Sequence, residues 1–367
     1  MMSLAKLAER MLMLYTAVAV PISAQLDLPL DTLSLPPGFD VQLFCNGSVP
    51  SARQLAVSEA AHHRIVYIGT DASPGQVFAL IDHNQTGLAT ELLTVLSGLD
   101  SLNGVVYAKG SLWVAEITQI THYDDVDSYV LQGKAFPAGT RINNQFPSES
   151  EHGLKYTRFG PDGRLYAPVG GPFNVGVCQP YGNIAYCTIN RLNANGSDLE
   201  TVATGVRNSV GYDWHPVDFV VDPDEARPGY NSSELYQACK ALGMKFYTGS
   251  MFPAAYRNTA FIALHGSWDR QPQIGHAVMN VNMLPDGTVT AYTTFATGWL
   301  QNANASNASS WGRPVDVLQL SDGSLLVSGD AEGAIYRFTY QRLCRRSVLL
   351  DEDVRAPFFQ RCTHMER

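Results

Sequence analysis

A two-strand phrase recurs along this chain and constrains its fold more than any other feature. In each copy a polar, glycine- or asparagine-containing turn is followed by an alternating apolar strand, and after a variable loop by a second one. Five copies are visible: 64–70 with 75–82, 109–116 with 119–125, 162–170 with 187–193, 257–266 with 276–282, and 322–330 with 333–340. With weaker strands between the copies, each unit describes a four-stranded blade of an all-β propeller.

The spacing of the copies predicts a six-bladed propeller with one blade incomplete. A blade needs roughly 40 to 50 residues, and the interval from Asp162 to Arg257 is about twice that. The stretch that should hold the extra blade, 217–234, is too short and too polar for a whole one. A β-sandwich with a small second domain is the alternative, because short, evenly spaced strands serve both folds.

The two ends of the chain differ from the repeats. Residues 1–24 carry Lys6 and Arg10, a short apolar run and then Pro-Ile-Ser-Ala, the layout of a secretory signal peptide. The run is too short to span a bilayer, and no other stretch reaches that length. We therefore expect an exported protein with a propeller domain over 25–340 and an irregular tail over 341–367. Beyond the leader, a helical signal is found at 233–240.

Export predicts paired cysteines and glycosylation. Six cysteines are present, and Cys178 and Cys187 are close enough in sequence to bridge a hairpin-sized loop, although buried free thiols are the alternative. The pairing of Cys45, Cys239, Cys344 and Cys362 stays open. Asn-x-Ser/Thr acceptor sites occur six times, at Asn46, Asn84, Asn195, Asn231, Asn304 and Asn307.

Charge and composition exclude some partners. The net charge of −9 argues against nucleic acid, and 16% charged residues with 31 glycines and 20 prolines suit a turn-rich β protein.

Polar residues just before inner strands are the candidates for chemistry, because propeller sites lie on the central axis. His152 precedes the turn at Gly160, and Arg207 with Asn208 lies in a loop that begins at Gly205. Arg313 precedes the last full blade, and the stretch 265–270 (HGSWDR) ends a buried strand. Taken singly, these could be a satisfied surface histidine and blade-bracing arginines. Several arginines at the same end of successive strands indicate an anionic ligand.

Longer phrases make a resemblance specific. The segments are similar to the soluble pyrroloquinoline-quinone-dependent glucose and sorbosone dehydrogenases, above all their fungal pyranose dehydrogenase branch. They cover most of the chain from 35 to 340: 35–39, 49–57, 102–107, 152–170, 205–216, 242–258, 265–270 and 311–337.

The resemblance implies a six-bladed propeller that holds pyrroloquinoline quinone and calcium on its axis. It implies that His152 takes the proton of a sugar hydroxyl while hydride passes to the quinone, a role that suits an imidazole. Arg207 and Asn208 then contact the quinone oxygens and stabilise their charge. Arg313 pairs with a cofactor carboxylate, Trp268 and Arg270 line the cofactor, and Asn103 matches a substrate-side position.

One departure from the family is large. Relatives carry an acidic, glycine-rich segment after the Asp-Trp-His-Pro phrase, and it is absent between Pro216 and Tyr230. That segment supplies the calcium loop, so the metal ligands of this chain are unknown from its sequence. Asp222, Asp224 and Glu225 could replace them, although such a run is more often a solvated turn.

The sequence therefore predicts a secreted, extracellular sugar dehydrogenase. Its partners would be a sugar and an external electron acceptor such as a haem protein or a quinone, without nucleic acid or a membrane span. A non-catalytic propeller that binds a sugar or a partner is the alternative. A calcium-dependent lactone hydrolase is disfavoured, because no spaced set of carboxylate and asparagine ligands is visible. The sugar itself and the oligomeric state cannot be predicted.

Overall fold

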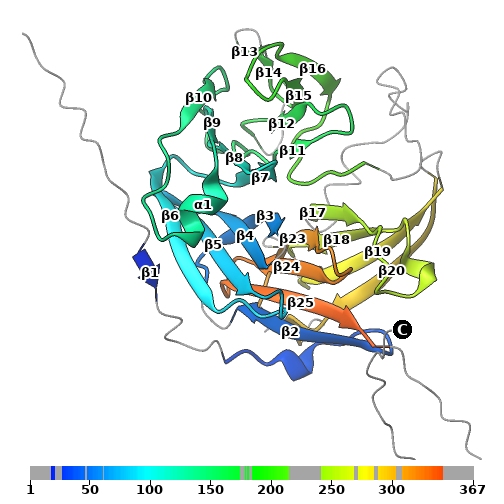
Figure 1. Ribbon diagram of the computed structural model, residues 1–367. Helices are drawn as coiled ribbons and strands as arrows, with labels where there is room; N and C mark the ends of the chain where they lie inside the picture. The colour runs from blue at the N-terminus through cyan, green and yellow to red at the C-terminus, as the bar shows by residue number, and fades with distance from the viewer. Residues whose placement is uncertain are drawn as a thin grey trace, which may run out of the picture.

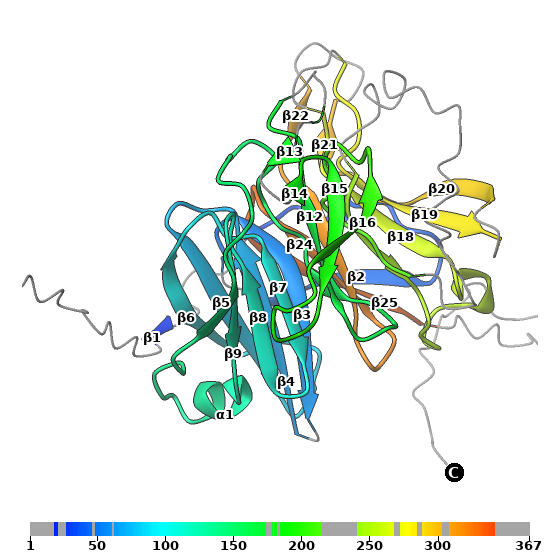
Figure 2. The same cartoon turned by 90° about the horizontal axis from the view of Figure 1, so that it is seen from above.

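The computed structural model is all-β, and the repeats form its blades. It describes residues 27–45, 48–60, 62–173, 178, 184–214, 241–267, 272–284, 288–302 and 308–341, with only the backbone described at 18–20, 180–181 and 241. Five antiparallel sheets, one of five strands and four of four strands, stand around a common centre, and their inner strands face it (Figure 1 and Figure 2).

The first three blades follow one another along the chain. The first consists of β3 (Ala52–Ala60), β4 (His63–Thr70), β5 (Gly75–His83) and β6 (Glu91–Leu99), with β1 (Val18–Val20) on its outer edge. The second consists of β7 (Gly104–Ala108), β8 (Ser111–Ala115), β9 (Ile120–Tyr123) and β10 (Thr140–Asn143). The third consists of β11 (Arg158–Phe159), β12 (Leu165–Val169), β15 (Thr188–Leu192) and β16 (Glu200–Thr204).

Two further blades complete the described set. The fourth consists of β17 (Ala241–Phe246), β18 (Ala260–Leu264), β19 (Ala277–Met283) and β20 (Val289–Thr297). The fifth combines β23 (Pro314–Gln319), β24 (Leu325–Gly329) and β25 (Ala334–Tyr340) with the N-terminal β2 (Phe39–Cys45). Two small hairpins pair β13 (Pro180–Tyr181) with β14 (Ile184–Ala185) and β21 (Leu300–Gln301) with β22 (Ser309–Ser310), and the 3-10 turns are η1 (Leu30–Thr32) and η2 (Ala254–Tyr256).

The predicted strand pairs are confirmed as the second and third strands of the five blades. The propeller is confirmed over the sandwich, whereas the count of six blades stays a prediction. The segment expected to hold the incomplete blade, the predicted helix at 233–240 and the C-terminal tail beyond 341 lie outside the described residues.

Apolar side chains on both faces of the blades hold neighbouring sheets together. In β4, Ile65 and Tyr67 pack toward the second blade, while Val66 and Ile68 pack toward the fifth. Successive strand residues point to opposite faces, so a strand buried on both sides needs the continuous apolar run that 64–70 provides. The core is thus a series of layers between blades and not one central cluster.

One short helix was not predicted. α1 (Val126–Leu131) follows β9 and buries Val126 and Val130 against the first two blades. Its Asp127 accepts hydrogen bonds from Tyr67 at 2.7 Å and from Tyr107. A helix of six residues is too short for its periodicity to appear in the sequence.

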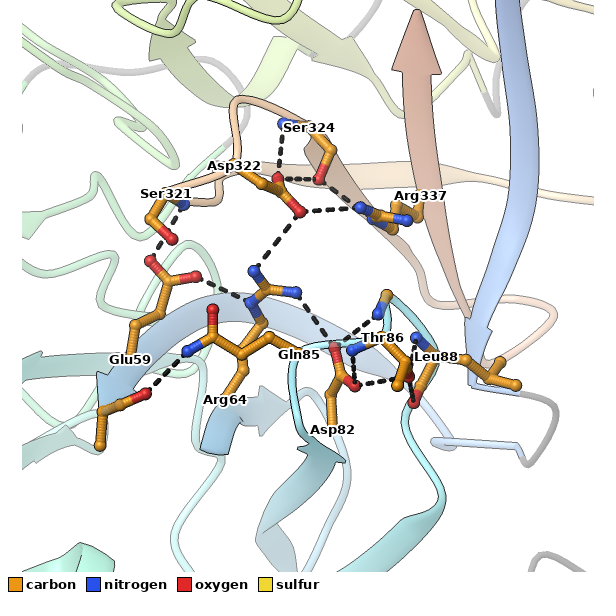
Figure 3. A network of polar contacts seen from close by, with 12 residues as sticks. Glu59, Arg64, Asp82, Gln85, Thr86, Leu88, Ser321, Asp322, Ser324 and Arg337 are labelled. Atoms are coloured by element: carbon orange, nitrogen blue, oxygen red, sulfur yellow. Dashed lines mark hydrogen bonds and ion pairs between the residues drawn. The ribbon is translucent and has the colours of Figure 1, made fainter. Parts of the chain in front are cut away.

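Two sets of contacts join the N-terminal and C-terminal parts of the chain. β2 pairs with β25, with Phe39 opposite Tyr340, so the last blade contains both an N-terminal and a C-terminal segment. Beside it the buried Arg64 of the first blade reaches Glu59 at 2.7 Å, Asp82 at 3.0 Å and Asp322 of the fifth blade at 3.4 Å (Figure 3). Arg337 also binds Asp322, at 2.7 Å.

The segment 205–214 joins the third blade to the fourth. The carboxylate of Asp213 lies 2.8 Å from Arg158 of β11 and 2.8 Å from Lys245 of β17. The hydroxyl of Tyr212 donates to the carbonyl of Tyr166 at 2.7 Å. A buried ion pair therefore bridges the inner strands of the two blades between which a further blade is predicted.

Candidate active site

The predicted site residues that the structure describes lie at one end of the propeller axis. Their loops enter an inner strand, leave a second strand or, for Arg207 and Asn208, leave the fourth strand β16 (Glu200–Thr204). Antiparallel pairing places these positions together, as when Ala52 faces Thr70 and Pro314 faces Gly329. We call this end the site rim; its residues considered below are Arg53, Asp71, His152, Gly170, Gly171, Arg207, Asn208, His265, Arg313 and Asp330.

His152 is held in one orientation on the site rim. Its Nδ1 lies 2.7 Å from the carbonyl oxygen of Gly171, which can only accept, so Nδ1 carries the proton and Nε2 keeps its lone pair. The backbone of His152 has φ 54°, the left-handed region that costs a non-glycine residue about 1–2 kcal/mol.

Arg207 lies directly against this imidazole. Its Nη1 is 3.2 Å from His152 Nε2 and 3.4 Å from the carbonyl oxygen of Phe173. The carbonyl of Arg207 accepts from the amide of Gly171 at 2.6 Å. The two residues that the resemblance assigned to catalysis, far apart in sequence, are therefore in contact, and Gly171 links them.

Glycines make this contact possible. A Cβ at Gly170 would lie 2.3 Å from the carbonyl oxygen and 2.7 Å from the Cβ of His152. A Cβ at Gly171 would lie 2.9 Å from the Sγ of Cys187. Because the two glycines after β12 have no side chain, the His152 loop can lie close to Gly170 and the disulfide can lie close to Gly171.

Cys178 and Cys187 form a disulfide, with their Cα atoms 5.9 Å apart. The carbonyl of Cys187 accepts from the amide of Val206, next to Arg207, at 2.9 Å. The disulfide is therefore connected to the backbone that carries Arg207. Cys45 is buried in β2, and the other three cysteines lie outside the described residues.

A second group on the site rim surrounds Arg313. Its Nη2 lies 3.0 Å from Nδ1 of His265, and Nε2 of that histidine lies 2.8 Å from Asp330. Arg53 contacts Asp330 at 3.2 Å and also pairs with Asp71. In this geometry His265 donates through Nε2 to the carboxylate and accepts through Nδ1 from Arg313.

The charges of this group follow from burial and from its two arginines. Burial lowers the pKa of His265, and Arg53 and Arg313 lower it further in spite of Asp330. Burial alone would raise the pKa of Asp330, yet the contact with His265 and the two guanidinium charges hold that pKa below its usual range. A neutral imidazole thus lies between the carboxylate of Asp330 and the guanidinium of Arg313, and Arg53 lies between the carboxylates of Asp330 and Asp71.

Sequence reasoning missed Arg53, His265 as an individual residue, and Asp330. Within the described part of the chain, the Nε of Arg53 is buried and has no hydrogen-bond partner. Arg53 lies within the segment 49–57, one of the family phrases, and its position at the start of an inner strand could have identified it.

The remaining predicted residues have different surroundings. Asn103 is buried, and its amide donates to the carbonyl of Lys155 at 3.0 Å beside a cavity of about 10 Å³ on the axis. It therefore braces the second blade against the third in this structure. Asn208 is half-exposed on the Arg207 loop. Trp268 and Arg270, like the acidic residues Asp222, Asp224 and Glu225, lie outside the described residues.

The described residues include two of the six predicted glycosylation acceptors. Asn84 and Asn195 are exposed, as acceptors must be, and Asn46, Asn231, Asn304 and Asn307 lie outside the described residues.

Among the residues that the structure describes, no helix is long and apolar enough to cross a membrane. In the same residues, no three His, Cys, Asp or Glu side chains gather as a metal site.

The fold and the site rim define a class of protein, a β-propeller with a cationic, histidine-bearing axial site. The TrAA12-like family model matches residues 235–341. Among solved structures, the chain is similar to the holo pyranose dehydrogenase PQQ domain from Coprinopsis cinerea, with TM-score 0.62 and 15% identity over 84% of this chain and 97% of that one. The calcium structure of a Trichoderma reesei family AA12 carbohydrate-active enzyme gives TM-score 0.63 and 15% identity over 87% and 99%.

A curated relative extends over most of the sequence. An uncharacterized protein of Borreliella burgdorferi is 25% identical over 369 residues, which cover 85% of this chain and 92% of that protein. The predicted resemblance to the pyranose dehydrogenase family is confirmed at the level of the TrAA12-like model over residues 235–341, and the solved structures, at 15% identity, share the propeller fold.

Proposed function

We propose that this protein oxidises a hydroxyl group of a sugar, with pyrroloquinoline quinone as the group that accepts the hydride. The observation that carries the proposal is the contact between Arg207 and His152, in which Gly171 fixes the imidazole and leaves Nε2 as its basic atom. The family match and the shared fold support the same chemistry.

The residues of the site rim fit an anionic, planar cofactor. Pyrroloquinoline quinone carries carboxylates and quinone oxygens, and the rim presents three arginines, Arg53, Arg207 and Arg313. The Nε of Arg53 is buried and has no hydrogen-bond partner among the described residues, and the guanidinium of Arg313 is positioned by His265. When bound, the quinone would supply the two-electron acceptor; Arg207 and Asn208 would hold its oxygens, and Arg313, Trp268 and Arg270 would hold the rest.

The chain's own residues provide the acid–base chemistry. Nε2 of His152 takes the proton from the hydroxyl oxygen as the hydride leaves the carbon that bears this oxygen, so the imidazole ends the step as a cation. Gly171 stabilises that cation, because its carbonyl already accepts from Nδ1. Arg207 must turn away from Nε2 to admit the hydroxyl, and its charge is then free to stabilise negative charge on the acceptor.

Calcium fits the described residues less well than the quinone. No cluster of three carboxylate, histidine or cysteine ligands occurs in the part of the chain that the structure describes. We therefore assign it no step, although calcium remains a proposed second cofactor.

We also propose that the protein is secreted and glycosylated and transfers its electrons to an external haem protein or quinone. The exposed Asn84 and Asn195 and the disulfide support this location. Expression in a eukaryotic secretory host, followed by enzymatic removal of N-glycans, should lower the apparent mass of the secreted protein.

The experiment that tests the proposal is the variant His152→Ala. We expect loss of sugar-dependent dye reduction by more than 100-fold, in keeping with the usual contribution of a general base, with quinone binding nearly unchanged. The exposed His62, before β4 at the opposite end of the first blade, provides the control His62→Ala, which should keep full activity. Equal loss of activity and quinone binding would make His152 a structural residue.

A second candidate function is a non-catalytic module that binds a sugar or a partner. One observation favours it: the guanidinium of Arg207 covers the nitrogen that a base would need. Sugar binding that is unaffected by the quinone and lost on His152→Ala would support this function over the first.

A further inference from the structure

A pair of histidines at the opposite end of the first blade has no part in the proposed reaction. His63 begins β4 and His83 ends β5, and the two residues face each other across the strands. Their Nδ1 atoms are 3.1 Å apart, with the rings nearly perpendicular at 83°. Two nitrogens at this distance can share only one proton, so in the neutral pair one ring donates and the other accepts.

The strands hold this geometry. His63 and His83 alternate with Arg64 and Asp82, whose buried ion pair fixes both strands on the other face of the sheet (Figure 3). Both rings are half-buried and solvent reaches them, since the His83 side chain is 36% exposed. The two rings are thus held in a fixed geometry and reached by solvent. Both properties favour a ligand-binding site over a chance contact between surface side chains.

A carboxylate stands behind one of the rings. Nε2 of His83, on the far side from the shared Nδ1 contact, lies 2.9 Å from Oε1 of Glu91 on β6. The donated hydrogen bond leaves Nδ1 of His83 as the atom with the lone pair. A carboxylate that orients the other nitrogen of an imidazole is the usual support of a metal-binding histidine.

We propose that Nδ1 of His63 and Nδ1 of His83 form a binding site for a transition-metal ion of the copper or zinc type. With metal–nitrogen bonds of about 2.0–2.1 Å, nitrogens 3.1 Å apart subtend about 100° at the metal, between the square-planar and tetrahedral values. The ion replaces the shared proton, and water or an outside ligand fills its other positions. Two imidazoles favour Cu²⁺ most strongly among the divalent ions.

The test is a calorimetric titration of the full chain, freed of metal, with Cu²⁺ and separately with Zn²⁺. We expect one Cu²⁺ site that weakens by about tenfold or more in His63→Gln and in His83→Gln, and by roughly tenfold in Glu91→Gln. The exposed neighbour His62 provides the matched control, and His62→Gln should bind as the wild type does. Glutamine keeps the side chain polar and long enough to preserve the strand ends.

A spectroscopic measurement decides the assignment without depending on affinity. The electron paramagnetic resonance spectrum of the first equivalent of Cu²⁺ should show two coordinated nitrogens, and only one in either glutamine variant. Unchanged affinity and spectra in both variants, or an equal loss in His62→Gln, would overturn the site. The activity proposed above plays no part in either measurement.

Discussion

At the scale of single residues, Lys155 makes a pH-dependent prediction. Its ammonium is buried, with Nζ 2.6 Å from the carbonyl of Gly153, next to His152, and burial lowers the pKa of Lys155 to about 7. The unfolded chain keeps this lysine protonated up to about pH 10, so between pH 7 and 10 it binds more protons than the folded protein. The free energy of unfolding should therefore rise with pH across that window.

The variant Lys155→Met removes the buried charge at nearly constant volume. It should be more stable than the wild type at pH 6 by on the order of a few kcal/mol, and the difference should shrink toward pH 10. Denaturant unfolding at several pH values measures this. A difference between the two proteins that does not change with pH would mean that Lys155 is not buried as a cation.

At the scale of elements, the disulfide should matter more for the site than for the fold. Cys187 begins the turn into β15 and binds Val206, whereas the sheet around it is held by its own ladder. Replacing both Cys178 and Cys187 by serine should lower stability by about 2–3 kcal/mol, the usual value for a short loop. Quinone binding should fall further than this loss of stability explains, since Arg207 loses its support.

The control for this prediction is Cys45→Ser, at a buried cysteine of the outer strand β2 in the fifth blade. It should destabilise the protein without a selective effect on quinone binding. If the double serine variant binds the quinone as tightly as the wild type at a temperature where both are folded, the disulfide does not position Arg207.

The elements also show which features could be predicted from sequence. The strand pairs could, because 64–70 alternates between two apolar faces and ends at turns. α1 could not be predicted, because it has only six residues and is held by hydrogen bonds from Tyr67 and Tyr107 to its Asp127. His152 and Arg207 were candidates from their positions, and their roles came from the family phrases, but only the fold brings the two residues together. The hydrogen bond of Asn103 to Lys155 depends on the packing of two blades, which no local pattern contains.

At the scale of the whole molecule, the inner strands of the third and fourth blades are joined by Asp213. Burial would raise the pKa of this carboxyl group, but Arg158 and Lys245 hold the pKa below its usual range. A lowered carboxyl pKa contributes stability above the unfolded pKa, near 4, and this contribution is lost as the pH falls through the folded value. The ion pair should thus hold the ring at neutral pH and fail in acid.

The variant Asp213→Asn should lower stability at pH 7 by about 3–5 kcal/mol, because it leaves two buried cations without their carboxylate. Its loss relative to the wild type should shrink as the pH falls below about 4, toward the lowered folded pKa of Asp213. Asp124 has a well-exposed carboxylate and serves as the control Asp124→Asn, which should change little. A loss of the same size at pH 3 and pH 7 would show that Asp213 acts through packing and not through its charge.

The central claim is that this propeller oxidises sugars with a bound quinone. The most direct measurement adds pyrroloquinoline quinone and calcium to the full-length protein and follows reduction of a dye acceptor with a panel of aldoses and ketoses. We predict dye reduction that requires both the quinone and a sugar, and that disappears in His152→Ala. Binding of the quinone without reduction of the dye by any sugar in the panel would contradict the claim.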